Sequence, residues 1–276
     1  MVAAEPPADA FSEADRDRIL ATLKEMTDRP RCNRIMGCRG AVVLASYGPA
    51  VAVPLADILD KNPRADGYWY FELIRLLGQL GNPRALDTLH ALLGDAGRWE
   101  VPIRAAQALG HLASPTSRAP LEAALARATA GDDVALQAAA HGALARVDPA
   151  HASAHRAALV ALVPRDAEGI AAIPPVVLDI LIEEVQTTRV PEALPGVRLA
   201  ALHDNRFVRA QALDTLARLH DTGGIPYALD RLDDTLPSIR QKALVALQEI
   251  TGIRTMTDPD EWRRWCERND LAKLPE

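Results

Sequence analysis

The residues of this sequence that could most readily do chemistry are histidines, because imidazole can hold a metal ion or move a proton. His151 and His155 are four residues apart, a spacing that places both rings on one face of a helix. Such a pair can bind zinc, but no glutamate completes an HExxH pattern and no third ligand is evident. The alternative, exposed histidines near the start of a helix, is favoured. We therefore predict neither a metal nor any other cofactor.

A run of four aromatic residues, from Tyr68 to Phe71, is the most unusual local feature. Residues on a helix turn by about 100° each, so four successive rings cannot all face one core. One or two of them must be partly exposed, and Trp and Tyr are favoured anchors at interfaces. The run predicts either a partner-binding surface that includes Tyr68, Trp69 and Tyr70, or a wide helix start packed against Pro63 and the preceding helices. The sequence leaves both open.

The signatures of several enzyme classes are missing. The sequence contains no GxGxxG, GxxxxGK[ST], GxSxG or CxxC pattern. His203-Asp204 and His220-Asp221 look like a repeated pair, but they fall at opposite ends of one predicted helix, about 25 Å apart. They cannot form one site, and no catalytic residue is predicted.

The three cysteines bear on the compartment of the protein. An odd number of cysteines fits reduced thiols in the cytoplasm. Cys32 and Cys38, however, are six residues apart with Gly37 between them, and a disulfide between them is an alternative if the protein is exported. Spacing alone does not give the Cα separation that a disulfide requires. We expect a cytoplasmic protein, with a periplasmic or secreted protein, its signal peptide absent from this chain, as the alternative.

Composition narrows the class of partner. The chain has 276 residues, a formal net charge of −6 and a pI near 5.7, so binding to a nucleic-acid backbone is disfavoured. No run of 18 apolar residues occurs, so no membrane span is expected. Aromatic residues make up only 4%, and the apolar residues are mostly Ala, Leu and Val, which is typical of closely packed helices.

Seven segments share one pattern, in which an apolar residue is followed by a polar residue and then by small or apolar residues at helical spacing. The polar residues of the seven segments are Arg39, Glu72, Arg104, Gln137, Asp179, Arg209 and Arg240. Five of the six steps between them are 30–33 residues long, and one is 42. Shorter amphipathic stretches, such as residues 83–94, lie between the segments. Each unit is therefore predicted to be a helix pair that stacks on its neighbours to complete a core.

The predicted fold class is all-α, a right-handed α-α superhelix of about seven helix pairs with a short C-terminal capping helix. Prolines fall where helices should start, and Gly48, Gly81 and Gly94 fall near predicted ends, where a left-handed cap is common. No segment alternates with period two, so no sheet is expected.

The predicted domain organisation has three parts. Residues 1–10 form a disordered tail, residues 11–254 form the repeat array, and residues 255–276 form a capping segment around Trp262 and Trp265. The long step contains an irregular insertion near residues 164–175, where Pro174-Pro175 cannot lie inside a helix.

The strings VRAQALDTLARL, IRAAQALGHLA and IRQKALVALQEI resemble the second helix of bacterial HEAT repeats, including the subclass like those of phycobilisome lyases. That subclass places Asp a few residues before the Arg, as Asp204 precedes Arg209 and Asp234 precedes Arg240 here. The resemblance implies a HEAT-type α-solenoid with a ladder, in which this Asp caps a helix and pairs with an Arg of its own or the adjacent repeat.

The sequence departs from this pattern at Glu72, Gln137 and Asp179, where the Arg is missing, so a regular ladder is not expected in the middle repeats. HEAT-like hydroxylases of the deoxyhypusine type use His-Glu pairs for iron. None of the seven histidines here is followed by Glu, which disfavours that activity.

The second helices of a solenoid usually line its concave face, so their polar residues are the default binding surface. The candidates from the central repeats are Arg75, Gln107, His111 and His141. With the aromatic run, they favour a non-catalytic scaffold or adaptor that binds a protein partner on the concave face. The first alternative is a small-molecule-binding or lyase-like HEAT enzyme with a groove near the aromatic run or His111 and His141. The second is a nucleic-acid-binding protein with a basic strip.

Overall fold

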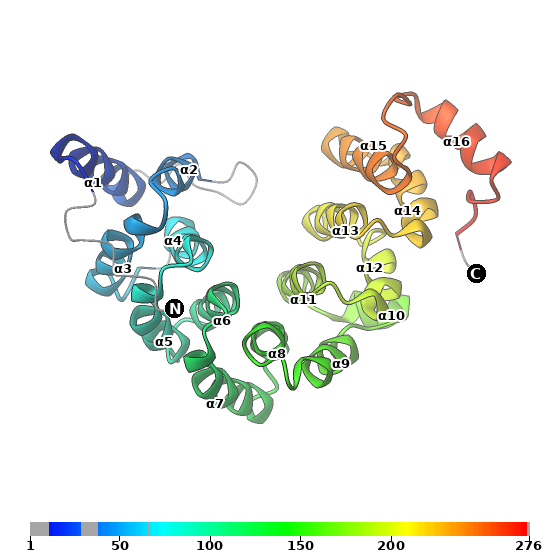
Figure 1. The fold of residues 1–276 in the computed structure, drawn as a ribbon. Coiled ribbons are helices and arrows are strands. Elements are labelled where there is room, and N and C mark those ends of the chain that lie inside the picture. Colours follow the sequence, from blue (N-terminus) through cyan, green and yellow to red (C-terminus); the bar gives the residue numbers. More distant parts are fainter. Residues whose placement is uncertain (1–10, 29–37, 66, 275–276) are drawn as a thin grey trace. The chain divides into compact units, whose positions relative to one another are not determined.

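The computed structural model describes residues 11–28, 38–65 and 67–274, and every regular element in these ranges is a helix. This confirms the predicted all-α class (Figure 1). The elements form two compact units. Unit 1 contains the described residues up to Gly131 together with Arg146–Pro149, and unit 2 contains Asp132–Ala145 and the residues from Ala150 onward.

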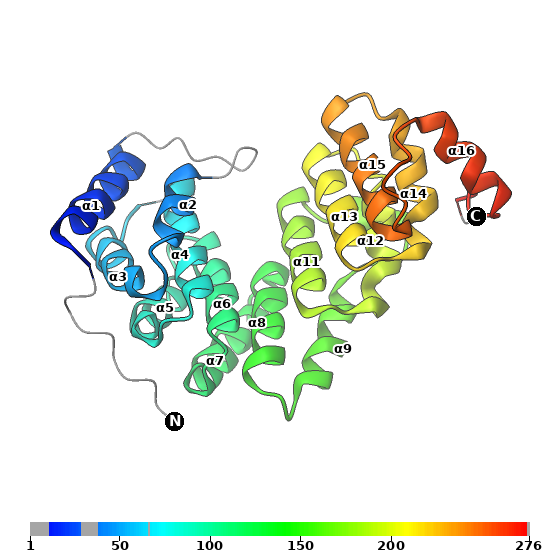
Figure 2. The same cartoon turned by 45° about the horizontal axis from the view of Figure 1, so that its top comes forward.

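Unit 1 is built from two layers of helices, in which first and second helices of successive pairs alternate along the chain (Figures 1 and 2). Its second helices lie side by side, with α4 in contact with both α2 and α6. The helices of this unit are α1 (Glu13–Asp28), α2 (Arg39–Ala45), α3 (Ala52–Lys61), α4 (Tyr68–Leu80), α5 (Leu86–Leu93), α6 (Glu100–Leu112) and α7 (Arg118–Ala130).

Unit 2 repeats this arrangement, and α13 contacts both α11 and α15. Helix α8 (Val134–Val147) begins this unit, and its last two residues belong to unit 1. The other helices are α9 (Ala152–Leu162), α10 (Ala167–Ala172), α11 (Pro175–Thr188), α12 (Leu194–Ala200), α13 (Arg206–Arg218), α14 (Ile225–Asp230), α15 (Pro237–Thr251) and α16 (Pro259–Arg268). The seven polar positions of the sequence pattern fall on α2, α4, α6, α8, α11, α13 and α15, the second helices of the predicted pairs.

Prolines mark the starts of the first helices through short 3-10 turns. Such a turn precedes α3 (Pro49–Val51), α5 (Pro83–Ala85), α7 (Pro115–Ser117) and α12 (Pro191–Ala193). Proline suits this position because its missing N–H would have no partner inside the helix. Pro175 and Pro237 begin α11 and α15 in the same way, and the predicted insertion contains the short helix α10 before Pro174.

Most second helices end on a residue with a left-handed backbone, at or next to the C-cap. These residues are Gly81, Ala113, Arg189, His220 and Gly252. Gly48 also has a positive φ, of 72°, but Gly94 has φ −80°. The left-handed cap predicted at Gly94 is therefore wrong, because a first helix ends there without reversing its backbone.

The core of unit 2 extends into the C-terminal helix. Trp262 and Cys266 of α16 are buried against it, and the Trp262 Nε1–H donates to the Met256 carbonyl at 3.1 Å. Burial raises the pKa of the Cys266 thiol to about 11, and this cysteine is free. Trp265 is only partly buried and meets the Trp262 ring edge to face. The segment thus packs on unit 2 as a capping helix would.

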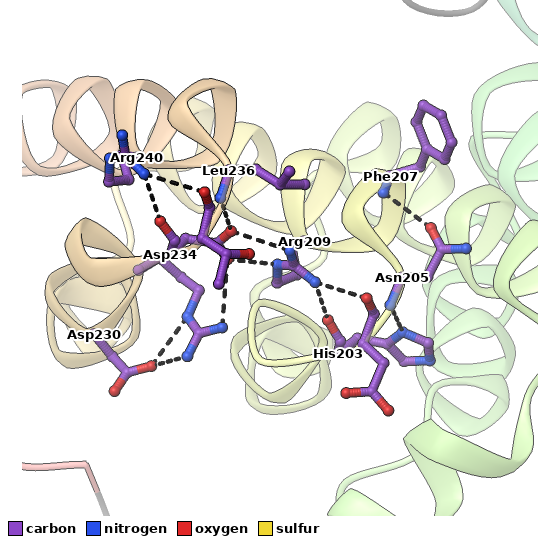
Figure 3. Close-up of polar contacts among 11 residues, drawn as sticks. His203, Asn205, Phe207, Arg209, Asp230, Asp234, Leu236 and Arg240 are labelled. Carbon is purple, nitrogen blue, oxygen red and sulfur yellow. Dashed lines mark hydrogen bonds and ion pairs between the residues drawn. The ribbon is translucent and has the colours of Figure 1, made fainter.

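A buried ion pair joins the repeats of α13 and α15 (Figure 3). Arg209 Nε lies 2.8 Å from Asp234 Oδ2, and Arg209 Nη2 donates to Asp234 Oδ1 at 3.1 Å. Arg209 Nη1 also donates to the carbonyls of His203 and Asp204. Asp234 in turn accepts the Leu236 N–H at 2.9 Å, at the start of α15. The ladder that the resemblance implied is present here, between adjacent repeats.

The ladder differs from the expectation in one repeat. Asn205, not Asp204, caps α13, because the Asn205 side chain accepts the Phe207 N–H at 2.9 Å. A second connection comes from a first helix, where Arg198 of α12 binds both oxygens of Asp221 at 2.7 Å. The connecting ion pairs of unit 2 therefore involve both helix layers.

Candidate functional site

Two second helices of unit 1 carry a cluster of polar side chains at matching positions. On α4 these are Tyr68, Glu72 and Arg75, and on α6 they are Glu100, Arg104 and Gln107. Each residue of α6 follows its counterpart on α4 by the 32-residue repeat step. The positions i, i+4 and i+7 share one face of a helix, so the six side chains form two parallel rows. We call this surface the α4–α6 polar face.

The row on α4 centres on Glu72, whose side chain is only 10% exposed. Arg75 donates to Glu72 Oε2 through Nη2 at 2.7 Å and through Nε at 3.0 Å. The charge of a nearly buried carboxylate is thus compensated by its own helix. The Arg75 side chain remains 41% exposed, so the guanidinium can also be reached from solvent.

The row on α6 centres on Arg104. Its Nη1 donates to Gln107 Oε1 at 3.0 Å, and its Nη2 donates to Glu100 Oε1 at 3.1 Å. The Arg104 and Glu100 side chains are 16% and 22% exposed, and Gln107 is buried. Arg104 is therefore held in one orientation by contacts along its own helix.

Tyr68 connects the two rows electrostatically. Its pKa rises to about 12, because burial and the neighbouring Glu72 carboxylate, with which it shares a hydrogen bond, both disfavour the phenolate. The positive charges of Arg104 and Arg75 act in the opposite sense. Helices α4 and α6 are in contact, so the α6 row lies beside the α4 row. At ordinary pH Tyr68 is a neutral hydrogen-bond donor.

A glycine sets the distance between the two helices. A methyl group added at Gly78 would lie 2.6 Å from the Ala108 Cα and 2.8 Å from its carbonyl oxygen. The backbones of α4 and α6 therefore approach as closely as a glycine permits. This contact holds the two polar rows side by side.

The predicted aromatic surface needs correction. Trp69 and Tyr70 are buried, 7% and 0% exposed, with their rings packed edge to face. The Arg98 guanidinium lies 4.8 Å from the centre of the Tyr70 ring. Tyr70 and Trp69 thus belong to the core of unit 1 and are not free to anchor a partner. The expected partial exposure falls on Tyr68 and Phe71.

The other predicted site residues are spread over the chain. Arg75 and Gln107 belong to the α4–α6 polar face, and His111 lies exposed one turn beyond Gln107. His141 is in the other unit. Sequence analysis missed Glu100 as a site residue, although the repeat step applied to Tyr68 leads directly to it.

His141 has a partner that the sequence did not indicate. Its Nδ1 lies 3.0 Å from Nδ1 of His155 on α9, and the two rings are tilted by 44°. Burial, and to a smaller extent the His155 charge, lowers the pKa of His141 to about 4. The four-residue spacing in the sequence predicts that His155 shares a helix face with His151. The structure instead shows a contact between two helices.

The low pKa of His141 predicts acid sensitivity. In the unfolded chain this histidine takes up a proton near pH 6.5, but in the fold only near pH 4. The folded state is therefore destabilised as the pH falls through this interval, and the effect is complete at about pH 4. We expect a loss of about 1–2 kcal/mol, after allowance for the partial exposure of the ring.

Urea unfolding of the wild type and of His141→Gln between pH 8 and pH 4 measures this loss. The difference in the free energy of unfolding between the two proteins should shrink by that amount on acidification. A difference that is constant with pH would contradict the prediction.

The remaining sequence-based expectations concern metals, membranes and the disulfide. Among the described residues no group of three or more His, Cys, Asp or Glu side chains could hold a metal ion. No single described helix is long and apolar enough to span a membrane. The bent helix pair of residues 39–45 and 49–61 meets the length and composition expected of a span only when its two helices are counted together. Cys38 is buried and Cys32 lies outside the described residues, so the bond between them stays a prediction.

The repeat architecture has a counterpart among known families. Residues 52–143, which include α4 and α6, match the family model of HEAT repeats. This confirms HEAT repeats in residues 52–143, and the helix pairs of both units are consistent with a HEAT-type α-solenoid. The phycobilisome-lyase-like subclass stays a resemblance.

One solved structure of similar fold is that of human deoxyhypusine hydroxylase in complex with glycerol. It is 16% identical, covers 87% of this chain and 98% of its own, and has a TM-score of 0.45. No curated protein sequence matches the chain.

The scaffold interpretation must be corrected in view of this comparison. It rested on the idea that a repeat array without catalytic motifs works as a non-catalytic adaptor. The similar structure is that of an enzyme, so the scaffold interpretation is not carried further. At this level of similarity the neighbour's activity is not transferred to the present chain.

Proposed function

We propose that this protein binds a small polar molecule carrying an anionic group, on the α4–α6 polar face of unit 1. The observation that carries the proposal is the gathering of charged and polar side chains on two adjacent second helices, where Arg75 holds the nearly buried Glu72 and Arg104 holds both Glu100 and Gln107. A few polar groups held in fixed positions are what orients a small ligand.

Arg75 is the side chain through which an anionic group would be recognised. Among the described residues it uses Nε and Nη2 on Glu72, and no such bond engages Nη1. A guanidinium has five N–H donors in a planar fork that matches a carboxylate or a phosphate. With its side chain 41% exposed, Arg75 can turn these remaining donors toward a ligand.

The other members of the face would orient the ligand. Tyr68 is neutral up to a pKa of about 12 and can donate, while Gln107 and Glu100 offer acceptor oxygens. Because Glu72 and Arg104 are held by contacts along their own helices, little side-chain entropy is lost when the ligand binds. A ligand with both an acidic group and a hydroxyl or amine would satisfy this set.

Thermal stabilisation by a panel of small carboxylic acids, amino acids and phosphate esters tests the proposal, because specific binding to the folded state must raise the melting temperature. We expect at least one compound to stabilise the wild type, and Arg75→Gln to abolish that stabilisation. Arg118→Gln is the matched control, since Arg118 is an exposed arginine of the same unit that pairs with Glu122.

The same compound should stabilise Arg118→Gln as it does the wild type. If no compound raises the melting temperature, or if Arg75→Gln responds like the wild type, the α4–α6 polar face is not a small-molecule site.

A further inference from the structure

Phe71 is the member of the aromatic run whose role is still open. It is partly exposed, whereas Trp69 and Tyr70 beside it are buried, with their rings packed edge to face. The counterpart of Phe71 one repeat step later, Ile103 on α6, is 0% exposed. Among the described residues, no other aromatic ring pairs with Phe71. Solvent therefore reaches a large apolar ring at a position that is closed in the next repeat.

The position of Phe71 on α4 places it between the two rows of the α4–α6 polar face. Phe71 lies two helical turns before Gly78, and residues seven apart lie on the same side of a helix. Gly78 faces the backbone of Ala108 on α6, so Phe71 also points toward α6. Arg104, one turn before Ala108, points from α6 toward α4 in the same way. The ring of Phe71 is therefore the apolar part of a face whose other members are polar.

Phe71 has polar neighbours on its own helix. Tyr68 is three residues before it and Arg75 four residues after it, and residues at these spacings have their Cβ atoms about 5–6 Å apart. Both neighbours are partly exposed. Small-molecule sites combine apolar and aromatic surface with a few polar groups that fix the orientation of the ligand. A ligand whose anionic group binds Arg75 has the rings of Phe71 and Tyr68 within reach of the rest of its body.

We propose that the ligand of the α4–α6 polar face is a small aromatic carboxylic acid, with its ring packed on Phe71 beside Tyr68 and its carboxylate bound by Arg75. This inference rests on the function proposed above and specifies the class of ligand. Two aromatic rings packed offset or edge to face attract each other beyond the area that they bury. The planar fork of a guanidinium matches a carboxylate. The short distance along α4 favours an acid whose carboxylate is close to its ring.

Calorimetric titration of the full chain with matched acids tests the proposal. The pairs are benzoate with cyclohexanecarboxylate, phenylacetate with cyclohexylacetate, and 3-phenylpropanoate with 3-cyclohexylpropanoate. Within a pair the charge is the same and the saturated ring is the more hydrophobic, so a preference for the aromatic member reports ring packing instead of burial alone. We expect at least one aromatic acid to bind about two- to tenfold more tightly than its saturated partner, the factor that an aromatic pair contributes.

Phe71→Leu keeps an apolar side chain and removes the ring, so it should abolish this preference while the saturated acid binds as before. Trp99→Leu is the matched control, because Trp99 is an aromatic residue of the same unit, 53% exposed, that lies outside the two rows. This variant should keep the preference of the wild type. Urea unfolding shows whether both variants remain folded, and the comparison of paired acids in the wild type needs no variant.

The outcomes separate this inference from the function on which it rests. If no acid binds, or if Arg75→Gln binds the acids like the wild type, the α4–α6 polar face is not an anion site and both proposals fail. If binding depends on Arg75 but the two acids of every pair bind equally, the anion site stands and the aromatic class is overturned. A preference that survives in Phe71→Leu, or that is lost in Trp99→Leu, overturns the aromatic class as well.

Discussion

Replacing Asp234 with alanine is expected to lower the free energy of unfolding by about 3–5 kcal/mol, the usual cost of breaking a buried ion pair by removing one partner. The Asp234 side chain is 2% exposed and that of Arg209 9%. Without the carboxylate, Arg209 keeps its charge in the interior and the Leu236 N–H loses its acceptor.

The electrostatics of Asp234 agree with this expectation. Burial alone would raise the pKa of its carboxyl group, but the Leu236 N–H and the Arg209 charge favour the carboxylate and bring the pKa below its ordinary value. The neighbouring Asp233 provides a matched control. It pairs with Arg263 at 2.6 Å but is 74% exposed, so Asp233→Ala should cost less than about 1 kcal/mol. Urea unfolding of both variants measures the two values, and equal losses would show that burial of the pair is not the reason.

The second large effect is expected at Gly78. A Gly→Ala change at an ordinary helical position stabilises by up to about 1 kcal/mol, through helix propensity. At Gly78 the new methyl group would meet the backbone of Ala108 instead of a flexible side chain, so α4 and α6 would have to move apart. We expect a net loss of about 1–3 kcal/mol, the range found for overpacked cores.

Gly97→Ala is the control for this change. A methyl group there would have its nearest neighbour, Asp95 Oδ1, at 3.6 Å, which is an ordinary contact. Thermal or urea unfolding should show little change for Gly97→Ala and the full loss for Gly78→Ala. Because the two polar rows depend on the same contact, Gly78→Ala should also weaken the ligand-dependent stabilisation that we propose. A fully stable Gly78→Ala protein would mean that the helices are not held by backbone contact.

The repeat pattern was sufficient to predict the fold, because the same residue types recur at positions that the same packing requires. The polar residues at Glu72 and Arg104 fall on second helices as expected, one step apart. The ladder could also be anticipated from Asp234, since an Asp in this place has both a helix start and a neighbouring Arg within reach. These are local and nearest-neighbour properties of the chain.

Burial of particular rings and contacts between helices could not be predicted in the same way. The aromatic run shows only that some rings are exposed, whereas the choice of Tyr68 over Trp69 depends on how α4 is rotated toward its neighbours. The contact between His141 and His155 depends on the crossing of two helices, which single-helix periodicity does not contain. The α4–α6 polar face could be predicted only in part. The repeat step identifies the matching residues of the two rows, but the sequence does not show that the rows are adjacent.

The left-handed residue that ends most second helices has a consequence for how this sequence can diverge. The backbone conformation recurs at five positions, yet only Gly81 and Gly252 are of the residue type that adopts it without penalty. Ala113, Arg189 and His220 each give up about 1–2 kcal/mol to keep the same chain reversal. In a linear array each repeat interacts only with its neighbours, so such a penalty stays in the repeat where it arises. The glycines at these positions can therefore be replaced in one repeat at a time, while the path of the chain is preserved.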